Sequence, residues 1–482
     1  MSMSEPTGTA GSGFALDTAL AGVLPAPPAH LLLIADQTQT LQAQLKASGY
    51  EVSSLALNAG HELSQWPTDT REAIYQVDLP NQEKDAALFD AAVVVGLSAA
   101  IHPLVLWSQL ATCLNPDAVV VFSAPRLTPT PRMQHWFKYV ATIGERCGFA
   151  AQDVALAEAG IHVFRKKIAP RWQLRHVRPQ DFEEIATLFL EVFGHPLSRS
   201  LWDWKYAQGQ GNAVIAARNG TLIAHYGGMY RDVMLCGKQD WVFQICDVMV
   251  HPQERGVMTR QGPFLLTAAT SAEIYGPLGF GFPNARAMQV AAKMGLYSEV
   301  GQMSEVRWQP ASSRARLRTR VKALNRENVE SQSVVNGLWS DMARDLRDGI
   351  VGLRDWTYLD QRYFNHPHNQ YEVLVITSRL TGVPMGVVVL RRLEASVELL
   401  DVIAPLTNLP LLLDQARRMT ELWGLSFLYC WVTKNYMPLF LNCDGKEEHI
   451  NISIPTSCWT DDPRADVFKD KWWLMSGDTD FR

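Results

Sequence analysis

Short apolar runs alternate with amphipathic stretches of helical length between residues 30 and 167. The runs with the length of a buried strand lie at 31–34, 50–56, 89–95 and 118–123. Helical patterns cover 38–48, a stretch that ends at 114, and 134–147, and a terminal hairpin is expected around Val154 and 161–164. Because buried strands that alternate with helices usually pair in parallel, the pattern predicts a doubly wound α/β domain with a mostly parallel sheet.

A second series of strand and helix patterns runs from Trp172 to Trp308. It opens with a strand, a proline-containing turn and a helix with an acidic first turn. Asn219-Gly220 separates two strand patterns, which predicts a hairpin with a two-residue turn. Further strands are expected at 233–235 and 241–250.

A third block follows a polar, charge-rich connector at 311–342. Its strand patterns lie at 371–376, 386–390, 399–403 and 425–429, with a helix at 409–423. The chain is therefore expected to be α/β throughout. The predicted parts are a flexible tail (1–29), a first domain (30–168), a second (171–308), a linker (309–342) and a third domain (343–482).

Composition narrows the class of protein. A length of 482 residues favours two to four domains. The net charge is −5, from 44 basic and 49 acidic residues, which gives no support for binding to nucleic acid or to an anionic membrane. The 7 cysteines form no C-x-x-C pair, and no apolar run reaches the ~18 residues that span a bilayer. We expect a soluble, cytoplasmic protein without a metal site.

The first block resembles a class I S-adenosylmethionine-dependent methyltransferase domain in the order of its elements. Phe89-Asp90 leads one strand, and Leu114-Asn-Pro-Asp117 precedes the next, as in the later motifs of that family. The turn after the first strand, at 35–39, has no glycine, although such Rossmann-like domains need one where the backbone approaches the cofactor. We therefore interpret the block as a degenerate, non-catalytic methyltransferase-like domain.

The segment from Val248 to Arg260 is the strongest indication of chemistry. A hydrophobic strand there runs into a proline, an Arg-Gly turn and a helix start, an arrangement whose backbone N–H groups suit a diphosphate. Together with 279–284 it resembles GNAT-type N-acetyltransferases, the acyl-coenzyme A dependent family. The resemblance implies that 171–308 is an acetyltransferase (GNAT) lobe that binds acyl-CoA. It also implies a second such lobe, whose turn at 404–408 lacks glycine and arginine and should not bind the cofactor.

The resemblance assigns the cofactor contacts residue by residue. The expected contacts are Met249, Val250, Gln253, Arg255, Gly256, Val257, Met258, Thr259 and Asn284. Met258 replaces a small residue of the family's turn, and Ala291 stands where many members carry a tyrosine that protonates the thiolate, so Tyr297 is the substitute candidate. A turn without ligand is the alternative, and Asn284 fits a helix N-cap equally well.

The reaction that the resemblance implies is direct attack of a neutral amine on the acyl thioester. Backbone N–H groups near Met249 and Val250 can stabilise the oxyanion, and Asp247 on the same strand face is the leading candidate for the general base. Asp247 also fits a structural aspartate or an anchor for the acceptor. His225 is a secondary catalytic candidate, which fits a core or surface histidine as well.

Two tryptophans and two aspartates close the sequence. Trp472 and Trp473, followed by Asp478 and Asp480, fit either an acceptor pocket or a terminal strand with a solvated acidic tail, and we favour the second interpretation. The predicted function is acyl-CoA dependent N-acylation of a small-molecule amine, with acetyl-CoA or another acyl-CoA as donor. An S-adenosylmethionine-dependent methyltransferase with GNAT-like recognition lobes and a non-catalytic binding or assembly protein are the alternatives. The acceptor, the acyl chain length and the oligomeric state, a homo-oligomer included, stay open.

Overall fold

The computed structural model divides the chain into two compact units. It describes residues 22–35, 39–56, 88–95, 103–123, 131–152, 161–167, 169–207, 210–255, 262–275, 278–311, 318–460 and 465–481. The first unit comprises residues 1–176 with 216–220, and the second comprises 177–215 with 221–482. Most of both predicted lobes lies in the second unit, and the expected division into three domains stays a prediction.

The first unit contains a six-stranded sheet ordered β2-β1-β3-β4-β6-β5. Its elements are β1 (His30–Ala35), α2 (Gln39–Ala47), β2 (Glu51–Ala56), β3 (Phe89–Val95), α4 (Pro103–Cys113), β4 (Leu114–Ser123), α5 (Pro131–Arg146), β5 (Phe149–Gln152), β6 (Ile161–Lys166) and β7 (Gln173–His176). The first four strands of that order are parallel, whereas β6 is antiparallel to β4 and to β5. The predicted sheet is confirmed as partly parallel. Within the expected tail, Leu24 is buried in the core of this unit.

The second unit holds most elements of the predicted first lobe, with residues 216–220 assigned to the first unit. The elements are α6 (Phe182–Phe193), α7 (Arg199–Tyr206), β8 (Gly211–Arg218), β9 (Thr221–Leu235), β10 (Lys238–Val250), α8 (Pro263–Tyr275), β11 (Gly279–Gly281), α9 (Ala285–Lys293) and β12 (Tyr297–Trp308). Asn219 and Gly220 have φ angles of 51° and 80°, so both residues are left-handed, as a two-residue hairpin turn requires. The predicted hairpin is confirmed.

The remaining elements follow Trp308. They are β13 (Thr319–Ala323), α10 (Val329–Asp345), β14 (Ile350–Gly352), α11 (Trp356–Leu359), the π-helix η6 (Asp360–Phe364), β15 (Glu372–Ser378), β16 (Pro384–Arg392), β17 (Ser396–Ile403), α12 (Leu409–Leu422), β18 (Phe427–Thr433), α13 (Met437–Leu441), β19 (Lys446–Glu448), β20 (Ser453–Ser457), α14 (Ala465–Phe468) and β21 (Trp472–Trp473). Short 3₁₀ turns occupy Pro179–Asp181, Pro252–Glu254, Leu406–Asn408 and Ser476–Asp478. The expected linker at 309–342 therefore holds β13 and most of α10.

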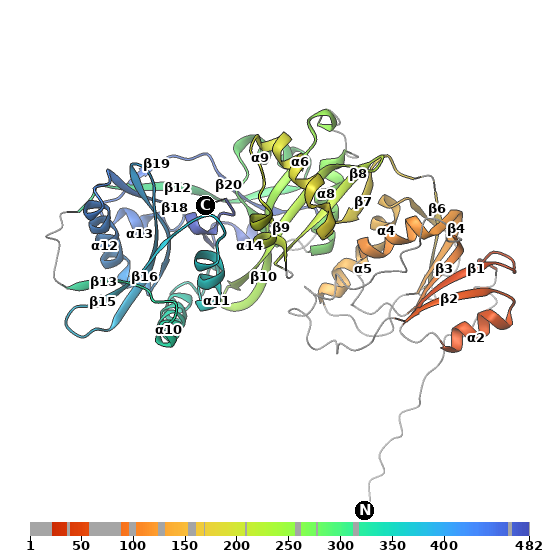
Figure 1. The fold of residues 1–482 in the computed structure, drawn as a ribbon, viewed down its shortest axis with the longest axis horizontal. Coiled ribbons are helices and arrows are strands. Elements are labelled where there is room, and N and C mark those ends of the chain that lie inside the picture. Colours follow the sequence, from red (N-terminus) through yellow and green to blue (C-terminus); the bar gives the residue numbers. More distant parts are fainter. Residues whose placement is uncertain are drawn as a thin grey trace, which may run out of the picture. The chain divides into compact units, whose positions relative to one another are not determined.

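The second unit has two sheets that exchange strands. The middle sheet is ordered β11-β10-β9-β14-β21, with β8 beside β9, and the C-terminal sheet is ordered β13-β15-β16-β17-β18-β12-β19. Strand β12 begins next to β20 and continues beside β18, so it leaves the predicted first lobe and joins the C-terminal sheet (Figure 1). Conversely, β14 and β21 extend the middle sheet. The predicted lobes are therefore joined by their hydrogen-bonded strands.

Helices cover both faces of the middle sheet. Apolar side chains of α6 and α7, such as Ile185 and Trp202, share one core with Met249 of β10. On the other face, Leu265 of α8 and Ala291 of α9 share a core with Tyr226 of β9. None of the described helices is long and apolar enough to cross a membrane.

Candidate functional site

Strand β10 carries a β-bulge at Asp247. Its pairing with β9 shifts register between Cys246 and Met249, so that residues 247–248 oppose the single residue Tyr226. Asp247 has a left-handed φ of 49°. An extra residue interrupts the alternation of side chains between the two faces of a sheet. Consequently, Cys246 and Asp247 both contact Tyr206 of α7.

Helix α7 presents a lysine to this bulge. Ser198 caps the N-terminus of this helix, because its hydroxyl accepts a hydrogen bond from the Leu201 N–H at 3.1 Å. The Lys205 ammonium lies 2.9 Å and 3.1 Å from the two carboxylate oxygens of Asp247. The Tyr206 hydroxyl donates to Asp247 Oδ2 at 2.8 Å. The carboxylate that sequence analysis selected as the base is thus bound by three donor contacts.

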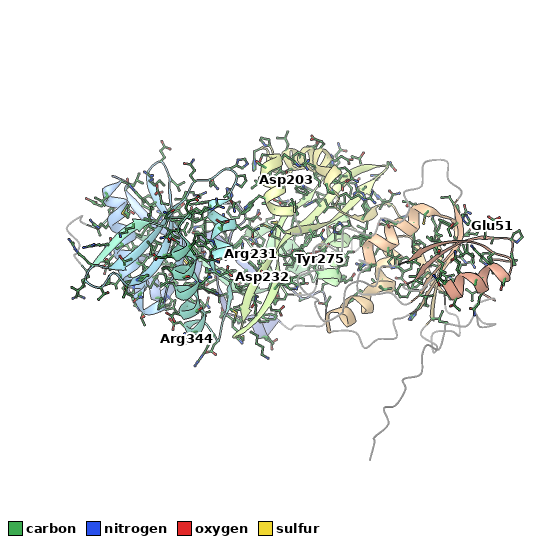
Figure 2. All side chains as sticks on the ribbon, turned by 60° about the horizontal axis from the view of Figure 1, so that its bottom comes forward. Glu51, Asp203, Arg231, Asp232, Tyr275 and Arg344 are labelled. Carbon is green, nitrogen blue, oxygen red and sulfur yellow. The ribbon has the colours of Figure 1, made fainter. Side chains whose placement is uncertain are left out.

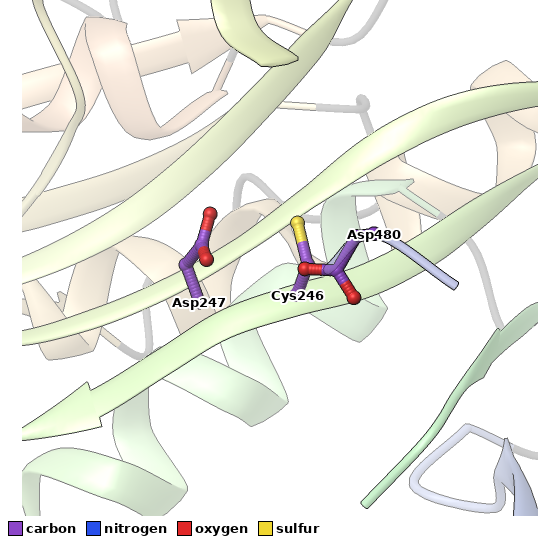
Figure 3. A group of neighbouring side chains, drawn as sticks. All are labelled: Cys246, Asp247 and Asp480. Carbon is purple, nitrogen blue, oxygen red and sulfur yellow. The ribbon is translucent and has the colours of Figure 1, made fainter. Parts of the chain in front are cut away.

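Asp480 completes this group from the far end of the sequence. Its Oδ2 lies 2.9 Å from Lys205 Nζ, and Figure 3 shows it approaching β10 beside Cys246 and Asp247. The side chains of Lys205, Asp247 and Asp480 are 4%, 7% and 12% exposed. We call these three residues with Tyr206 the Lys205 cluster. Two carboxylates around one ammonium give the cluster a formal net charge of −1.

The cluster also has the spacing of a metal site. Ligand atoms of Cys246, Asp247 and Asp480 lie within 4.8 Å of one another (Figure 3). The Lys205 ammonium, however, already provides the cation between the two carboxylates. Burial raises the pKa of the Cys246 thiol well above its usual value, which keeps it protonated and unsuited to a cation. We therefore assign the cluster no metal.

The electrostatics of the cluster keep Lys205 charged and Asp247 ionised. Burial alone would raise the pKa of Asp247, but the Lys205 ammonium and the Tyr206 hydroxyl outweigh it, and the pKa is lowered. Burial would lower the pKa of Lys205, and the carboxylates of Asp247 and Asp480 raise it instead. Burial raises the pKa of Tyr206 as well, so Tyr206 remains a hydrogen-bond donor.

His225 contacts the backbone of the bulge. Its Nδ1 lies 2.7 Å from the carbonyl oxygen of Asp247, which can only accept, so Nδ1 carries the proton. The ring is fully buried, and burial lowers its pKa, so the imidazole is neutral. Its Nε2 has no hydrogen-bond partner among the described residues. His225 therefore supports the backbone of Asp247, and its catalytic role stays a prediction.

Tyr297 lies on the opposite face of the middle sheet from the Lys205 cluster. It is buried in the core that contains α8 and α9, and its hydroxyl pairs with that of Tyr226. Burial raises the pKa of Tyr297. The position is consistent with a proton donor only if the thiolate lies on that face, and the assignment of Tyr297 stays a prediction.

Strands β10 and β11 separate next to the bulge. They pair in parallel only from Phe243 to Ile245 and from Gly279 to Gly281. From Cys246 to Val250, β10 continues beside β9, but no described strand pairs with its other edge. The backbone N–H of Val250 faces this edge, because the neighbouring His251 N–H is directed toward β9, and such an edge can bind an amide-containing ligand. The cofactor contacts expected of Met249 and Val250 stay a prediction.

The structure describes only some of the remaining predicted cofactor residues. Gln253 and Arg255 are exposed after β10, and Arg255 Nε donates to the Val250 carbonyl at 3.0 Å. The Asn284 side chain accepts from the Ala287 N–H at 2.9 Å, so it caps α9. Its predicted contact with the cofactor remains untested. The residues Gly256, Val257, Met258 and Thr259 lie outside the described part of the chain.

The acidic end of the sequence is not the solvated tail that we favoured. Residues 476–480, which we call the 476–480 segment, begin after β21, and Asp478 is 1% exposed. Asp478 pairs with Arg354 at 2.5 Å and with Arg231 (Figure 2) at 3.4 Å, and its carbonyl accepts from Gln244 at 2.6 Å. Only the strand part of that interpretation is correct, because both tryptophans are buried in β21.

Comparison with protein families identifies part of the chain. Residues 173–282 match the family described as Acetyltransferase (GNAT) domain. This match covers α6 to β11 and includes Lys205 and Asp247, but not Asp480. No curated protein matches the chain.

Solved structures resemble the chain at low identity. A conserved protein of unknown function from Enterococcus faecalis V583, titled a probable N-acyltransferase, is 12% identical, with a TM-score of 0.49 over 63% of this chain and 75% of that one. A GCN5-related N-acetyltransferase from Kribbella flavida is 13% identical, with a TM-score of 0.42 over 60% and 71%. The N-myristoyltransferase of Saccharomyces cerevisiae is 8% identical, with a TM-score of 0.40 over 60% and 80%. Scores at this level decide neither fold nor activity.

Proposed function

We propose that the protein is an acyl-CoA dependent N-acyltransferase whose acceptor is a small-molecule amine. The observation that carries the proposal is the separation of β10 from β11 next to the bulge at Asp247, within the matched GNAT domain. The free edge of β10 supplies backbone donors and acceptors for an acyl-CoA. The Lys205 cluster, which contains Asp247 of that strand, supplies charge for an amine.

The donor supplies an activated acyl carbonyl, and the chain supplies the groups around it. Met249, Val250, Gln253, Arg255, Gly256, Val257, Met258, Thr259 and Asn284 are the residues proposed to hold acetyl-CoA or another acyl-CoA. Backbone N–H groups of the β10 edge are suited to stabilise an oxyanion. The buried, protonated thiol of Cys246 is a poor nucleophile, which favours direct attack by the amine over an acyl-cysteine.

Asp480 is a better candidate for the proton acceptor than Asp247. Asp247 accepts from Lys205 through both oxygens and from Tyr206, and its pKa is lowered, so it is a weak base. Asp480 has one described contact, from Lys205 to Oδ2, and is the most exposed member of the ion pairs. The second oxygen of Asp480 can take the proton from the attacking amine, while Asp247 and Lys205 hold it in place.

Binding of the donor tests the proposal first. Acetyl-CoA at about 100 times its dissociation constant should stabilise the protein by roughly 2.7 kcal/mol. Gly256→Glu adds bulk and negative charge to the proposed phosphate turn and should abolish this stabilisation. Gly337→Glu is the matched control, because a side chain at Gly337 in α10 meets nothing within 4 Å. Equal stabilisation of both variants, or none of the wild type at millimolar acetyl-CoA, would reject the proposal.

Turnover tests the roles of the two carboxylates. Release of coenzyme A thiol is measured with primary amines of several kinds: an amino sugar, a polyamine and an amino-acid amide. Asp480→Asn should lower kcat by about 100-fold or more, while acetyl-CoA still stabilises the protein. An unchanged rate in Asp480→Asn would show that the proton leaves by another route.

We also propose that the first unit is a methyltransferase-like domain that does not bind S-adenosylmethionine. The order β2-β1-β3-β4-β6-β5, with an antiparallel final pair, supports the proposal, as does the absence of glycine from sequence positions 35–39. Titration calorimetry with S-adenosylmethionine is the test, and heat of binding would contradict the proposal.

A further inference from the structure

The backbone of the 476–480 segment is held by a single arginine. Arg362 Nε donates to the carbonyl of Gly477 at 2.9 Å, and its Nη2 donates to the carbonyl of Thr479 at 3.0 Å. The Thr479 carbonyl belongs to the peptide bond that joins Thr479 to Asp480. One guanidinium therefore fixes the two carbonyls on either side of Asp478 and the peptide plane that leads into Asp480.

Arg362 is itself fixed on both sides. It lies on the π-helical turn η6 and is 3% exposed, and its Nη1 donates to the Tyr371 hydroxyl at 3.2 Å. Its guanidinium carbon also lies 5.5 Å from the ring centre of Trp204, the residue before Lys205 on α7. Single π-helical turns are common at functional sites. Arg362 thus contacts the segment that carries Asp480 and the helix that carries Lys205.

The contacts of Arg362 with the segment depend on the planar, forked shape of the arginine side chain. Two donors of one planar group reach two carbonyls, whereas the single ammonium of a lysine cannot keep both contacts in fixed directions. Gly477 fits the same arrangement, because a Cβ at this position would lie 2.1 Å from the Tyr363 hydroxyl and 2.8 Å from the Leu400 carbonyl. The segment therefore has little freedom to move Asp480 while Arg362 is in place.

We propose that Arg362 is a positioning residue of the acyl-transfer site. It acts through the backbone of Thr479 and directs the Asp480 carboxylate toward Lys205 and the incoming amine. This inference rests on the proposed function. Through Arg362 of η6, the C-terminal half of the chain would then help to position a carboxylate at a site of the GNAT domain.

The test combines turnover with a measurement that needs no substrate. Arg362→Met and Arg362→Lys are compared with Arg326→Met, because Arg326 is 44% exposed and pairs with Asp360 of the same π-helical turn. Arg362→Met should lower kcat by about 100-fold, as misplacement of a reacting group by about 1 Å does, without changing KM for acetyl-CoA.

Combination with Asp480→Asn separates positioning from general stability. If Arg362 acts only through Asp480, Arg362→Met should cause no further loss of kcat in the Asp480→Asn background. If the fold losses of kcat in the two single variants multiply in the double variant, the inference is overturned. The amides of residues 479–481 should also exchange hydrogen faster in free Arg362→Met than in wild type or Arg326→Met.

The exchange measurement keeps the inference separate from the proposed function. Absence of acetyl-CoA binding by the wild type would end the proposed function and the catalytic part of the inference. Faster hydrogen exchange at 479–481 in Arg362→Met would then still show that Arg362 holds the backbone of the 476–480 segment. Unchanged exchange in Arg362→Met would overturn that role of Arg362 whether or not the protein is an acyltransferase.

Discussion

Removal of Arg354 is the most direct test of how the two sheets of the second unit are joined. Arg354 Nη2 lies 2.5 Å from Asp478, its Nε lies 3.3 Å from Asp401, and its Nη1 donates to the Gly352 carbonyl at 2.7 Å. The side chains of Arg354 and Asp401 are 0% exposed, and that of Asp478 is 1% exposed. Arg354→Met would leave two carboxylates in the interior without their shared cation.

The size of the effect follows from this burial. Removal of one partner of a buried ion pair typically destabilises a protein by about 3–5 kcal/mol. With roughly 2–4 °C per kcal/mol for large domains, Tm at pH 7 should fall by roughly 6–20 °C. Arg344→Met is the matched control, because Arg344 (Figure 2) is 71% exposed and pairs with Asp341 at 3.1 Å on α10. Loss of such a surface pair should change the stability by no more than about 1 kcal/mol.

The pH dependence provides a second check on the same variant. Without Arg354, burial and repulsion by the Asp478 carboxylate raise the pKa of Asp401 in the folded state above that in the unfolded state. Such a group destabilises the fold above its folded pKa, and the cost is lost as pH falls and both states become protonated. The Tm difference between wild type and Arg354→Met should therefore be smaller at pH 5 than at pH 7. A loss no larger than that of Arg344→Met, or one that does not shrink in acid, would refute the reasoning.

Three further variants test other parts of the molecule. His225→Leu removes the donor to the Asp247 carbonyl and should lower the free energy of unfolding by about 1–3 kcal/mol, measured with denaturant. His225→Asn keeps an N–H donor and should lose less, and equal losses would show that this hydrogen bond does not support the bulge. Lys205→Met leaves two buried carboxylates together, so its Tm deficit should be largest at pH 7 and shrink in acid; a pH-independent deficit would argue against it. Gly144→Ala places a Cβ 2.8 Å from the Trp107 ring and should cost about 1–3 kcal/mol in the first unit, with hydrogen exchange in the second unit unchanged.

Local sequence patterns predicted most individual elements. The apolar runs at 31–34 and 89–95 correspond to β1 and β3, and the helical pattern at 409–423 corresponds to α12. These elements bury several neighbouring residues, such as Leu31 and Leu412, so their periodicity is visible in a short window. Asn219-Gly220 was equally visible, since a two-residue hairpin turn requires left-handed residues.

The assignment of strands to sheets could not be predicted in the same way. The pattern of β12 identifies a strand, but not that it pairs with β20 in one part and β18 in another. The three-residue strand β14 and the two-residue strand β21 are too short to show a period, although both extend the middle sheet. The domain boundaries at Trp308 and through 309–342 stay a prediction, since they rest on neighbours in sequence and cannot show which strands share a sheet.

The members of the Lys205 cluster were visible to different degrees. Asp247 was selected because it is expected on the same strand face as Met249, whose backbone lies near the expected oxyanion contact. Lys205 carries no local signal, since a lysine in a helix is usually exposed. It lies 42 residues from Asp247 and 275 residues from Asp480 in sequence. The only available hint was that two acidic residues follow the adjacent tryptophans of β21, and that pattern fits a solvated tail equally well.

The Lys205 cluster makes the GNAT domain depend on the rest of the second unit. The Lys205 side chain is 4% exposed, so its buried charge must be compensated by carboxylates. Asp480 provides one of the two carboxylates that do so, and Asp247 provides the other. Asp480 in turn reaches Lys205 because Arg362 and Arg354, both from the segment after β14, bind the residues just before it. A fragment ending at residue 308 would keep the match at 173–282 but would lose β14, β21 and Asp480. It would leave Lys205 with Asp247 alone, so the cluster requires residues far beyond the matched domain.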